Sequence, residues 1–207
     1  MLFSAHLGVG FFGVIDVPIG TTGMATTIPT VGAPTVGMRY WLNDLIGLEA
    51  AIGIGFDSGT FNTGGTSSGL GSAWGLAFHL ALPLAIAHWK HFAFIAQPEI
   101  ELGFSGGSVP GAASGNGDDD LINGFLFRVG GKLGGEIHMG FIGIPQLSLQ
   151  AGIGLHLQYS SAGNDVCTDG TCSGHSTSSI NTIGIHTSIE HNPWEWFTGS
   201  ITAIYYL

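Results

Sequence analysis

A period-two alternation of bulky apolar residues with small or polar ones recurs along this chain and restricts what it can fold into. In residues 46–56, the even positions from Leu48 to Phe56 are apolar, whereas the odd positions from Gly47 to Gly55 are glycine, alanine or glutamate. Successive side chains of a β-strand point to opposite faces, so the pattern predicts strands with one bulky and one small or polar face. Nine such runs are found, at residues 3–11, 35–43, 46–56, 73–89, 92–104, 125–139, 147–159, 179–189 and 196–207.

The run at residues 73–89 also has to be considered as a membrane-spanning helix. It contains no Asp, Glu, Lys or Arg, and its length approaches the roughly 17–25 residues that such a helix needs. Its bulky residues fall on alternate positions from Trp74 to Leu84, however, with small residues, His79 and Pro83 between them. This spacing favours a strand.

The composition indicates whether the bulky face is buried in a soluble protein or faces lipid. Only 9% of the residues are charged and 36 are glycine, whereas a globular domain usually has about 25% charged residues and about 7% glycine. A soluble β-sandwich is the alternative, but it would turn polar and often charged residues outward to water. The sequence therefore predicts one all-β domain over residues 1–207, a closed antiparallel up-and-down transmembrane β-barrel whose small face lines a narrow lumen.

The connections between the runs are alternately long and short. The long connections are residues 16–34, 57–72, 105–122 and 161–178, and the short ones are residues 43–44, 87–91, 140–145 and 191–194. Long outer loops and tight periplasmic turns are typical of outer-membrane barrels. Bacterial single-chain barrels have an even number of strands, so we expect eight, with residues 179–189 in an outer loop or in one long bent final strand. Ten is the alternative, if residues 16–34 hold a further strand.

Two segments resemble the small bacterial outer-membrane β-barrel proteins, of the kind represented by the outer membrane protein A barrel. One is residues 36–50, with the pattern of a strand, a tight turn and a second strand, and the other is the ending at residues 201–207. The ending is similar to the C-terminal signal read by the barrel insertion machinery, with Tyr205 and Leu207 on alternate positions, although Leu207 stands where Phe is more usual. The resemblance implies a location in the bacterial outer membrane with the long loops extracellular. It also implies contact with membrane lipid and lipopolysaccharide. Members of the class serve as envelope anchors, adhesins, small pores and occasionally lipid enzymes.

Charged residues on the predicted inner face should pair, because an unpaired buried charge is costly. Arg39 and Glu49 flank the turn at residues 43–44 almost symmetrically. We expect a structural network of salt bridges in the lumen, and the alternative is a selectivity ring that lines a pore. The residues of this predicted network are Arg39, Glu49, Glu99, Glu101, Arg128, Lys132 and Glu136.

Four histidines, His6, His79, His138 and His156, also fall on the inner face. We expect them to fill the lumen as polar side chains, with a metal or proton site as the alternative. His156 and Ser160 share a face, and a lipid-modifying enzyme would use a histidine and a serine of this kind. No catalytic residue is assigned, and the chain is not expected to be an enzyme.

Two features lie in the long connections. Cys167 and Cys172 are expected to form a disulfide at a loop tip in an oxidising compartment, and a metal pair completed by His175 is the alternative. The triplet Asp118, Asp119 and Asp120 offers at most a weak surface site for divalent cations, because it lacks the spaced ligands of a calcium loop. No other metal site and no cofactor is expected.

The partners are restricted by charge. The chain has a net charge of −10 and only four Lys and Arg residues, which excludes a nucleic-acid partner. Gly131 and Gly135 on the outward face favour a patch where another envelope subunit packs.

Met1 is followed at once by strand-like sequence, so we expect a mature or engineered start. The sequence favours a structural or interaction barrel with a narrow or plugged polar lumen, then a small porin-like passive channel, then a lipid-modifying enzyme.

Overall fold

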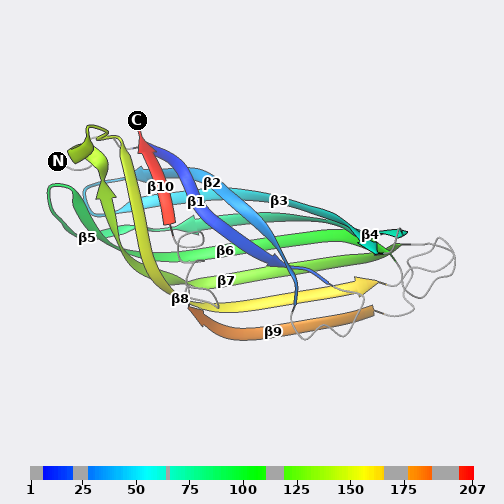
Figure 1. The fold of residues 1–207 in the computed structure, drawn as a ribbon. Helices are drawn as coiled ribbons and strands as arrows, with labels where there is room; N and C mark the ends of the chain where they lie inside the picture. The colour runs from blue at the N-terminus through cyan, green and yellow to red at the C-terminus, as the bar shows by residue number, and fades with distance from the viewer. Residues whose placement is uncertain (1–6, 21–27, 64–65, 111–118, 166–176, 188–200) are drawn as a thin grey trace.

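The computed structural model describes residues 7–20, 28–63, 66–110, 119–165, 177–187 and 201–207, which form one antiparallel sheet of ten strands (Figure 1). The strands are β1 (Leu7–Pro18), β2 (Thr30–Trp41), β3 (Gly47–Thr63), β4 (Thr66–Ala81), β5 (Leu84–His88), β6 (Phe92–Pro110), β7 (Asp119–His138), β8 (Leu147–Asp165), β9 (Thr177–Thr187) and β10 (Ile201–Tyr206). A short 3-10 helix, η1 (Met139–Ile142), connects β7 to β8. No helix in these residues is long and apolar enough to cross a membrane.

Eight of the strands close a ring of hydrogen bonds in the order β1, β2, β3, β4, β6, β7, β8, β10 and back to β1. The ring closes where the first strand meets the last, with Gly8 opposite Tyr206 and Phe11 opposite Ala203. The start of β1 and the end of β10 therefore lie at the same end of the ring. The all-β antiparallel fold and eight strands in the ring are confirmed.

The odd number of runs in the sequence is explained by β9, which lies outside this ring, and β10, which lies in it. β10 pairs with β8 over Leu147–Ala151, and β9 pairs with it over Leu155–Asp165, so the two share one edge. The expected even barrel is therefore wrong, because one strand position is divided between two separate strands.

The sequence left room for a tenth strand in residues 16–34, but the tenth strand of the described sheet lies elsewhere. It arises because the run at residues 73–89 is split between β4 and β5 at Leu82 and Pro83. Proline has no N–H to donate and is poorly tolerated inside a sheet ladder, which explains the break.

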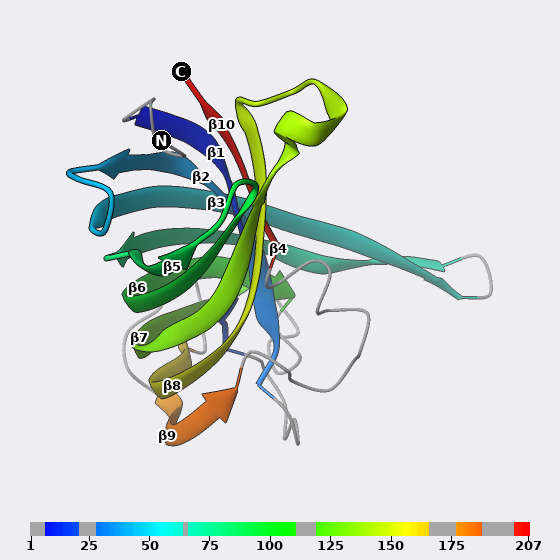
Figure 2. The same ribbon diagram turned by 90° about the vertical axis from the view of Figure 1, so that its left-hand side faces the viewer.

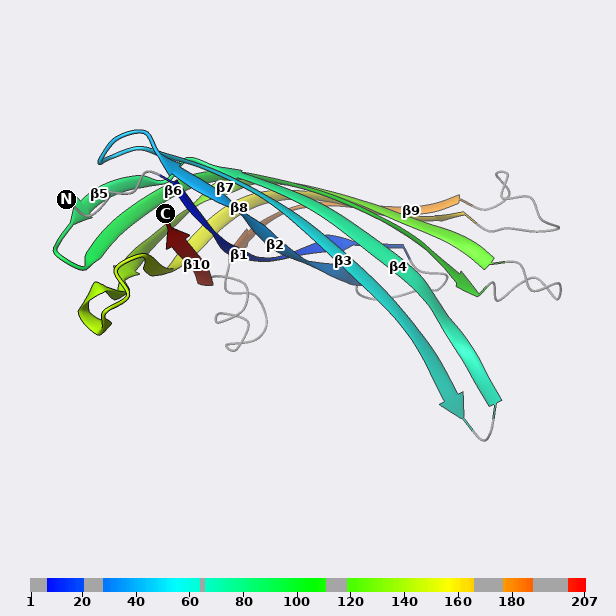
Figure 3. The same ribbon diagram turned by 90° about the horizontal axis from the view of Figure 1, so that it is seen from above.

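The expected long loops are shorter than the sequence suggested, because the strands extend into them. β3 and β4 pair as far as Thr63 and Thr66, and β6 and β7 as far as Pro110 and Asp119. The β3–β4 hairpin reaches away from its neighbours at the end opposite the tight turns (Figure 2, Figure 3). The tight turn at residues 43–44 is confirmed, and Asn43 Oδ1 there accepts backbone hydrogen bonds from Leu45 and Ile46 at 2.9 Å each.

The second half of β1 and the first half of β2 leave the ring, and we call residues 14–20 and 30–34 the β1–β2 arm. β1 pairs with β10 only as far as Phe11, and β2 pairs with β3 only from Thr35 onward. A bulge between Phe11 and Val14, with Gly13 at a φ of +99°, redirects β1 at this level. The Thr35 hydroxyl donates to the Gly13 carbonyl at 2.9 Å and fixes the bend. Beyond it, the arm crosses the long strands obliquely (Figure 1).

The arm lies on the concave side of β3, β4, β6 and β7 and packs one apolar face against them. Ile15 and Val17 form a buried cluster with Ala33, Ala77 and Leu126. Ile19 and Val31 form a second cluster with Ile122. The opposite face of the arm, which includes Asp16, Thr30 and Pro34, is exposed. This half of the molecule is therefore two-layered and filled by its own chain.

Glycines on the inner face allow the backbone of the arm to approach the sheet closely. A Cβ atom on Gly124 would lie 1.8 Å from the Pro18 carbonyl oxygen, and one on Gly55 would lie 2.1 Å from that of Gly32. The Gly20 amide also donates to the Asn123 carbonyl at 3.1 Å. The small face predicted from the sequence is thus a surface on which the arm's backbone lies.

We expect Gly124→Ala to destabilise the fold by roughly 1–3 kcal/mol, because the new methyl group overlaps the arm. Gly131→Ala is the matched control on the same strand, since its nearest neighbour would be 3.4 Å away, and we expect a change within about 0.5 kcal/mol. Guanidinium unfolding, followed by tryptophan fluorescence, measures both. Equal stability of the two variants would show that the arm does not lie on β7.

Candidate functional site

The inner face of the ring carries the candidate site, a network of ionised side chains that we call the charge network. All seven residues predicted for it point inward from β2, β3, β6 and β7, on positions that alternate with the bulky outward residues. Registers across the ring bring them to neighbouring levels, as in the opposite pairs Arg39 with Glu49 and Glu101 with Arg128. These seven side chains therefore lie on the face to which the alternation assigned them.

Arg39 is the centre of the network and is fully buried. Its Nε donates to Glu49 Oε2 at 2.7 Å, and its Nη1 donates to Glu136 Oε2 at 2.8 Å. Its Nη2 donates to Gln150 Oε1 at 2.7 Å and to Gln97 Oε1 at 3.4 Å. One guanidinium thus joins four strands of the ring to β2.

His79 links this centre to a second arginine. Its Nε2 lies 2.9 Å from Glu49 Oε1, and its Nδ1 lies 3.5 Å from Glu101 Oε1. Arg128 Nη1 donates to Glu101 Oε2 at 2.7 Å, and Arg128 Nη2 donates to Gln158 Oε1 at 2.8 Å. Hydrogen bonds and ion pairs together therefore extend along the lumen from Arg39 to Arg128.

Glu99 forms a third group beside these two. Lys132 Nζ lies 2.9 Å from Glu99 Oε2, and His156 Nε2 pairs with Glu99 Oε1. The network thus brings four carboxylates together with two guanidinium groups, one lysine amine and two imidazoles. Each carboxylate has a cationic or imidazole partner, which is the condition for keeping such groups inside a protein.

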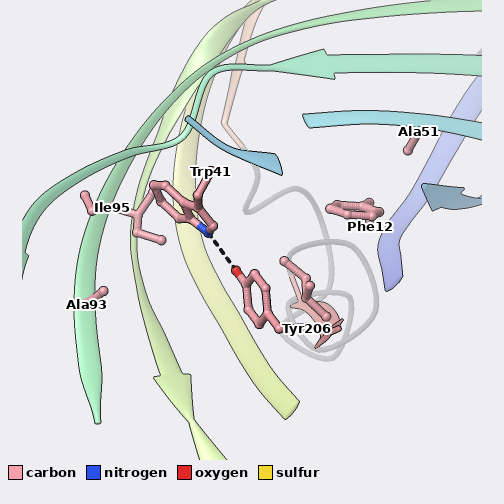
Figure 4. Close-up of a cluster of buried hydrophobic side chains, with 8 residues drawn as sticks. Phe12, Trp41, Ala51, Ala93, Ile95 and Tyr206 are labelled. Carbon is pink, nitrogen blue, oxygen red and sulfur yellow. Dashed lines mark hydrogen bonds between the residues drawn. The ribbon is translucent and has the colours of Figure 1, made fainter. Parts of the chain in front are cut away.

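The C-terminal strand contacts the same network through Tyr206. The Tyr206 hydroxyl donates to Glu136 Oε1 at 2.9 Å and accepts a hydrogen bond from Trp41 Nε1 at 3.1 Å (Figure 4). Both rings belong to a buried cluster that includes Phe12 and Ile95. Tyr205 and Leu207, named as the insertion signal, are exposed on either side of Tyr206.

Sequence reasoning did not assign several members of the site. Tyr206 and Trp41 lie in segments that the sequence identifies only as an apolar ending and a strand. The glutamines that accept from the two arginines are also not predicted, namely Gln97, Gln150 and Gln158. For Tyr206, the signal was its alternation with the outward Tyr205, which predicts an inward side chain.

The histidines fall into two groups. His79 and His156 belong to the charge network, as described above. His138 is buried at the turn end of the ring, where its Nε2 lies 3.7 Å from Glu136 Oε1 and its ring centroid is 5.8 Å from that of Tyr206. His6 lies outside the described residues.

The His156 and Ser160 pair does not form the arrangement that a lipid-modifying enzyme would use. His156 pairs with Glu99, whereas the Ser160 hydroxyl hydrogen-bonds to that of Thr182. A nucleophile and its base need to be within hydrogen-bond reach of one another, and these two residues have different partners.

One group has the donor set for a metal ion. Ligand atoms of His79, Glu99 and Glu101 lie within 4.8 Å of one another. Lys132 and Arg128 already pair with the two carboxylates, so a metal ion would have to compete with two cations of the chain itself. The geometry is that of a charge-compensated network.

The remaining predicted sites are in the loops. Cys167, Cys172 and Asp118 lie outside the described residues. Asp119 is exposed and Asp120 is buried, because consecutive residues of β7 face opposite ways. The pair therefore does not form a common surface site for a cation.

The predicted outward glycine patch is only partly present. A Cβ on Gly135 would lie 2.5 Å from the Phe92 ring, so that ring covers the glycine. Of these two glycines, only Gly131 could carry a Cβ atom at ordinary contact distances from its neighbours.

Comparison with models of known protein families finds none that matches the chain. Comparison with curated proteins finds no match either.

Arg39→Met should destabilise the protein by roughly 3–5 kcal/mol, because it leaves two buried carboxylates without their main cation. Arg128→Met is the matched control. The Arg128 side chain is 22% exposed and has one carboxylate partner, so we expect a smaller loss. Adding Glu49→Gln and Glu136→Gln to Arg39→Met should recover part of the stability. Denaturant unfolding measures all three, and equal losses for the two single variants would contradict a central role for Arg39.

Proposed function

We propose that the chain spans a bilayer as a barrel and serves as a structural or interaction component of the bacterial outer membrane. Support comes from the outer surface of the ring, where bulky apolar side chains are exposed on strand after strand. Leu155 on β8 is 59% exposed, and Leu80 on β4 is 57% exposed. Such a continuous apolar surface is unfavourable in water and suits hydrocarbon.

The burial of side chains in the interior is the observation that carries the proposed role. In the ring half, the charge network crosses the interior with Arg39 and Glu136 fully buried. In the other half, the arm packs Ile15, Val17 and Ile19 into the concave face. A conducting pore needs a continuous polar path, and here a salt-bridge layer is followed by an apolar layer. A sealed barrel is suited to anchoring or to contacts made by its ends.

The orientation follows from the same proposal. The tight turns would face the periplasm, and the projecting β3–β4 hairpin would lie outside the cell. The contacts would be membrane lipid and lipopolysaccharide, the insertion machinery during assembly, and other envelope proteins at the loops.

Replacing an outward apolar residue with lysine distinguishes a bilayer from water. In a membrane, we expect Leu155→Lys to cost about 2–4 kcal/mol if the site lies near the midplane. Ser58→Lys is the control, because Ser58 is exposed on the projecting hairpin, and its effect should stay within about 0.5 kcal/mol. Guanidinium unfolding in phospholipid vesicles measures both. If Leu155→Lys leaves stability unchanged, the ring does not lie in hydrocarbon.

Planar-bilayer recording tests the sealed lumen. The inserted wild-type protein should give no stable single-channel steps, because both lumen layers block ions. Heat-modifiable gel mobility confirms that the sample is folded. Stable steps whose size changes in Glu99→Gln or Arg128→Met would establish the channel alternative instead.

A further inference from the structure

The outer surface of the ring contains a hollow that the proposed function does not explain. It lies over β1, β2, β3, β4 and β6 and has a volume of about 740 Å³. Ligand pockets have volumes of roughly 300–1,000 Å³, so the hollow is large enough for a substantial apolar group. We call it the outer groove, and its principal outward side chains are Val36, Met38, Ala50, Ile52, Phe78 and Leu80.

The strand registers explain where the hollow comes from. Ala50 lies opposite Met38 on one side and Leu80 on the other, so a methyl group stands between two long side chains. In the next row, Ile52 lies between Val36 and Phe78. The floor of the groove is therefore lowest at Ala50, and its rim consists of apolar side chains.

The chemistry of the groove restricts what occupies it. Among its lining residues, only His79 has a polar side chain, and that ring is buried and bonded to Glu49 inside the ring. A charged headgroup or a polar peptide would therefore lose hydrogen bonds to water without gaining any from these side chains. The flexible side chain of Met38 adapts to irregular apolar shapes.

Symmetry argues against a second copy of this chain. In a two-fold dimer, the same patch of each subunit faces the other. Two hollows facing each other would leave a void, which close packing does not tolerate. The occupant should be slender, flexible and wholly apolar.

We propose that the outer groove binds one acyl chain of a membrane phospholipid. This inference rests on the proposed function, because it requires the outer surface to face lipid. Met38 is three residues from Trp41 at the turn end of β2, and a strand rises about 3.3 Å per residue. The groove therefore lies roughly 10 Å from the turn end of the ring, and the lipid belongs to the leaflet on that side.

Native mass spectrometry tests the proposal on the full chain. The protein is released from detergent micelles that contain dioleoylphosphatidylethanolamine, and the retained lipids are counted. We expect the wild-type protein to keep one phospholipid. Ala50→Phe fills the floor of the groove and should raise the dissociation constant for the lipid about tenfold, equivalent to roughly 1.4 kcal/mol.

Ala151→Phe is the matched control, because Ala151 is also an exposed alanine on a ring strand, β8, away from the groove. It should keep the lipid as the wild type does. Heat-modifiable mobility checks that each variant is folded, and Ala50→Leu, a smaller filling, replaces Ala50→Phe if that variant does not fold.

Four results would overturn the proposal. The first is equal lipid retention in the wild type and Ala50→Phe, and the second is the absence of lipid from the folded wild-type protein. The third is equal loss in Ala151→Phe. The fourth is a dimer mass that Ala50→Phe abolishes, which would identify a second copy as the occupant. The bilayer assignment itself is tested separately by Leu155→Lys, so failure of one can be told from failure of the other.

Discussion

The ring depends on how a fully buried guanidinium is satisfied. Arg39 cannot lose its charge, and removing it from water is costly unless charge and hydrogen bonds are supplied in its place. Glu49, Glu136, Gln150 and Gln97 supply them from β3, β7, β8 and β6. The strands can satisfy this one side chain together only when they curve around it, so the network favours ring closure and a single register at that end.

The other end of the molecule is organised by apolar contact. Beyond Thr35 and the bulge at Gly13, the wall no longer includes β1 and β2, and the curved sheet would expose its concave face. The β1–β2 arm covers that face with Ile15 and Val17. Inner glycines such as Gly124 let the backbones approach within contact distance. The two halves are thus filled by opposite chemistries.

The outer surface follows from the same alternation that fills the interior. Each inward ion or glycine places its neighbours outward, so a ring filled with polar groups has an apolar exterior. The outer groove forms where this exterior is interrupted by the small side chain of Ala50 between Met38 and Leu80. A wall with period-two side chains therefore carries both the network inside and a specific hollow outside.

The sequence alone predicts most of the strands, their two faces and the inward placement of the seven Arg, Lys and Glu residues of the charge network. These follow from local alternation, so Glu49 and Arg128 could be placed inward without knowledge of their partners. The sequence did not reveal that β9 and β10 share one edge of β8, that the β1–β2 arm turns into the lumen, or that Tyr206 binds Glu136. These features join residues far apart in the chain. Strand register and backbone bending decide such contacts, and both depend on packing across the whole ring, which a period-two pattern does not encode.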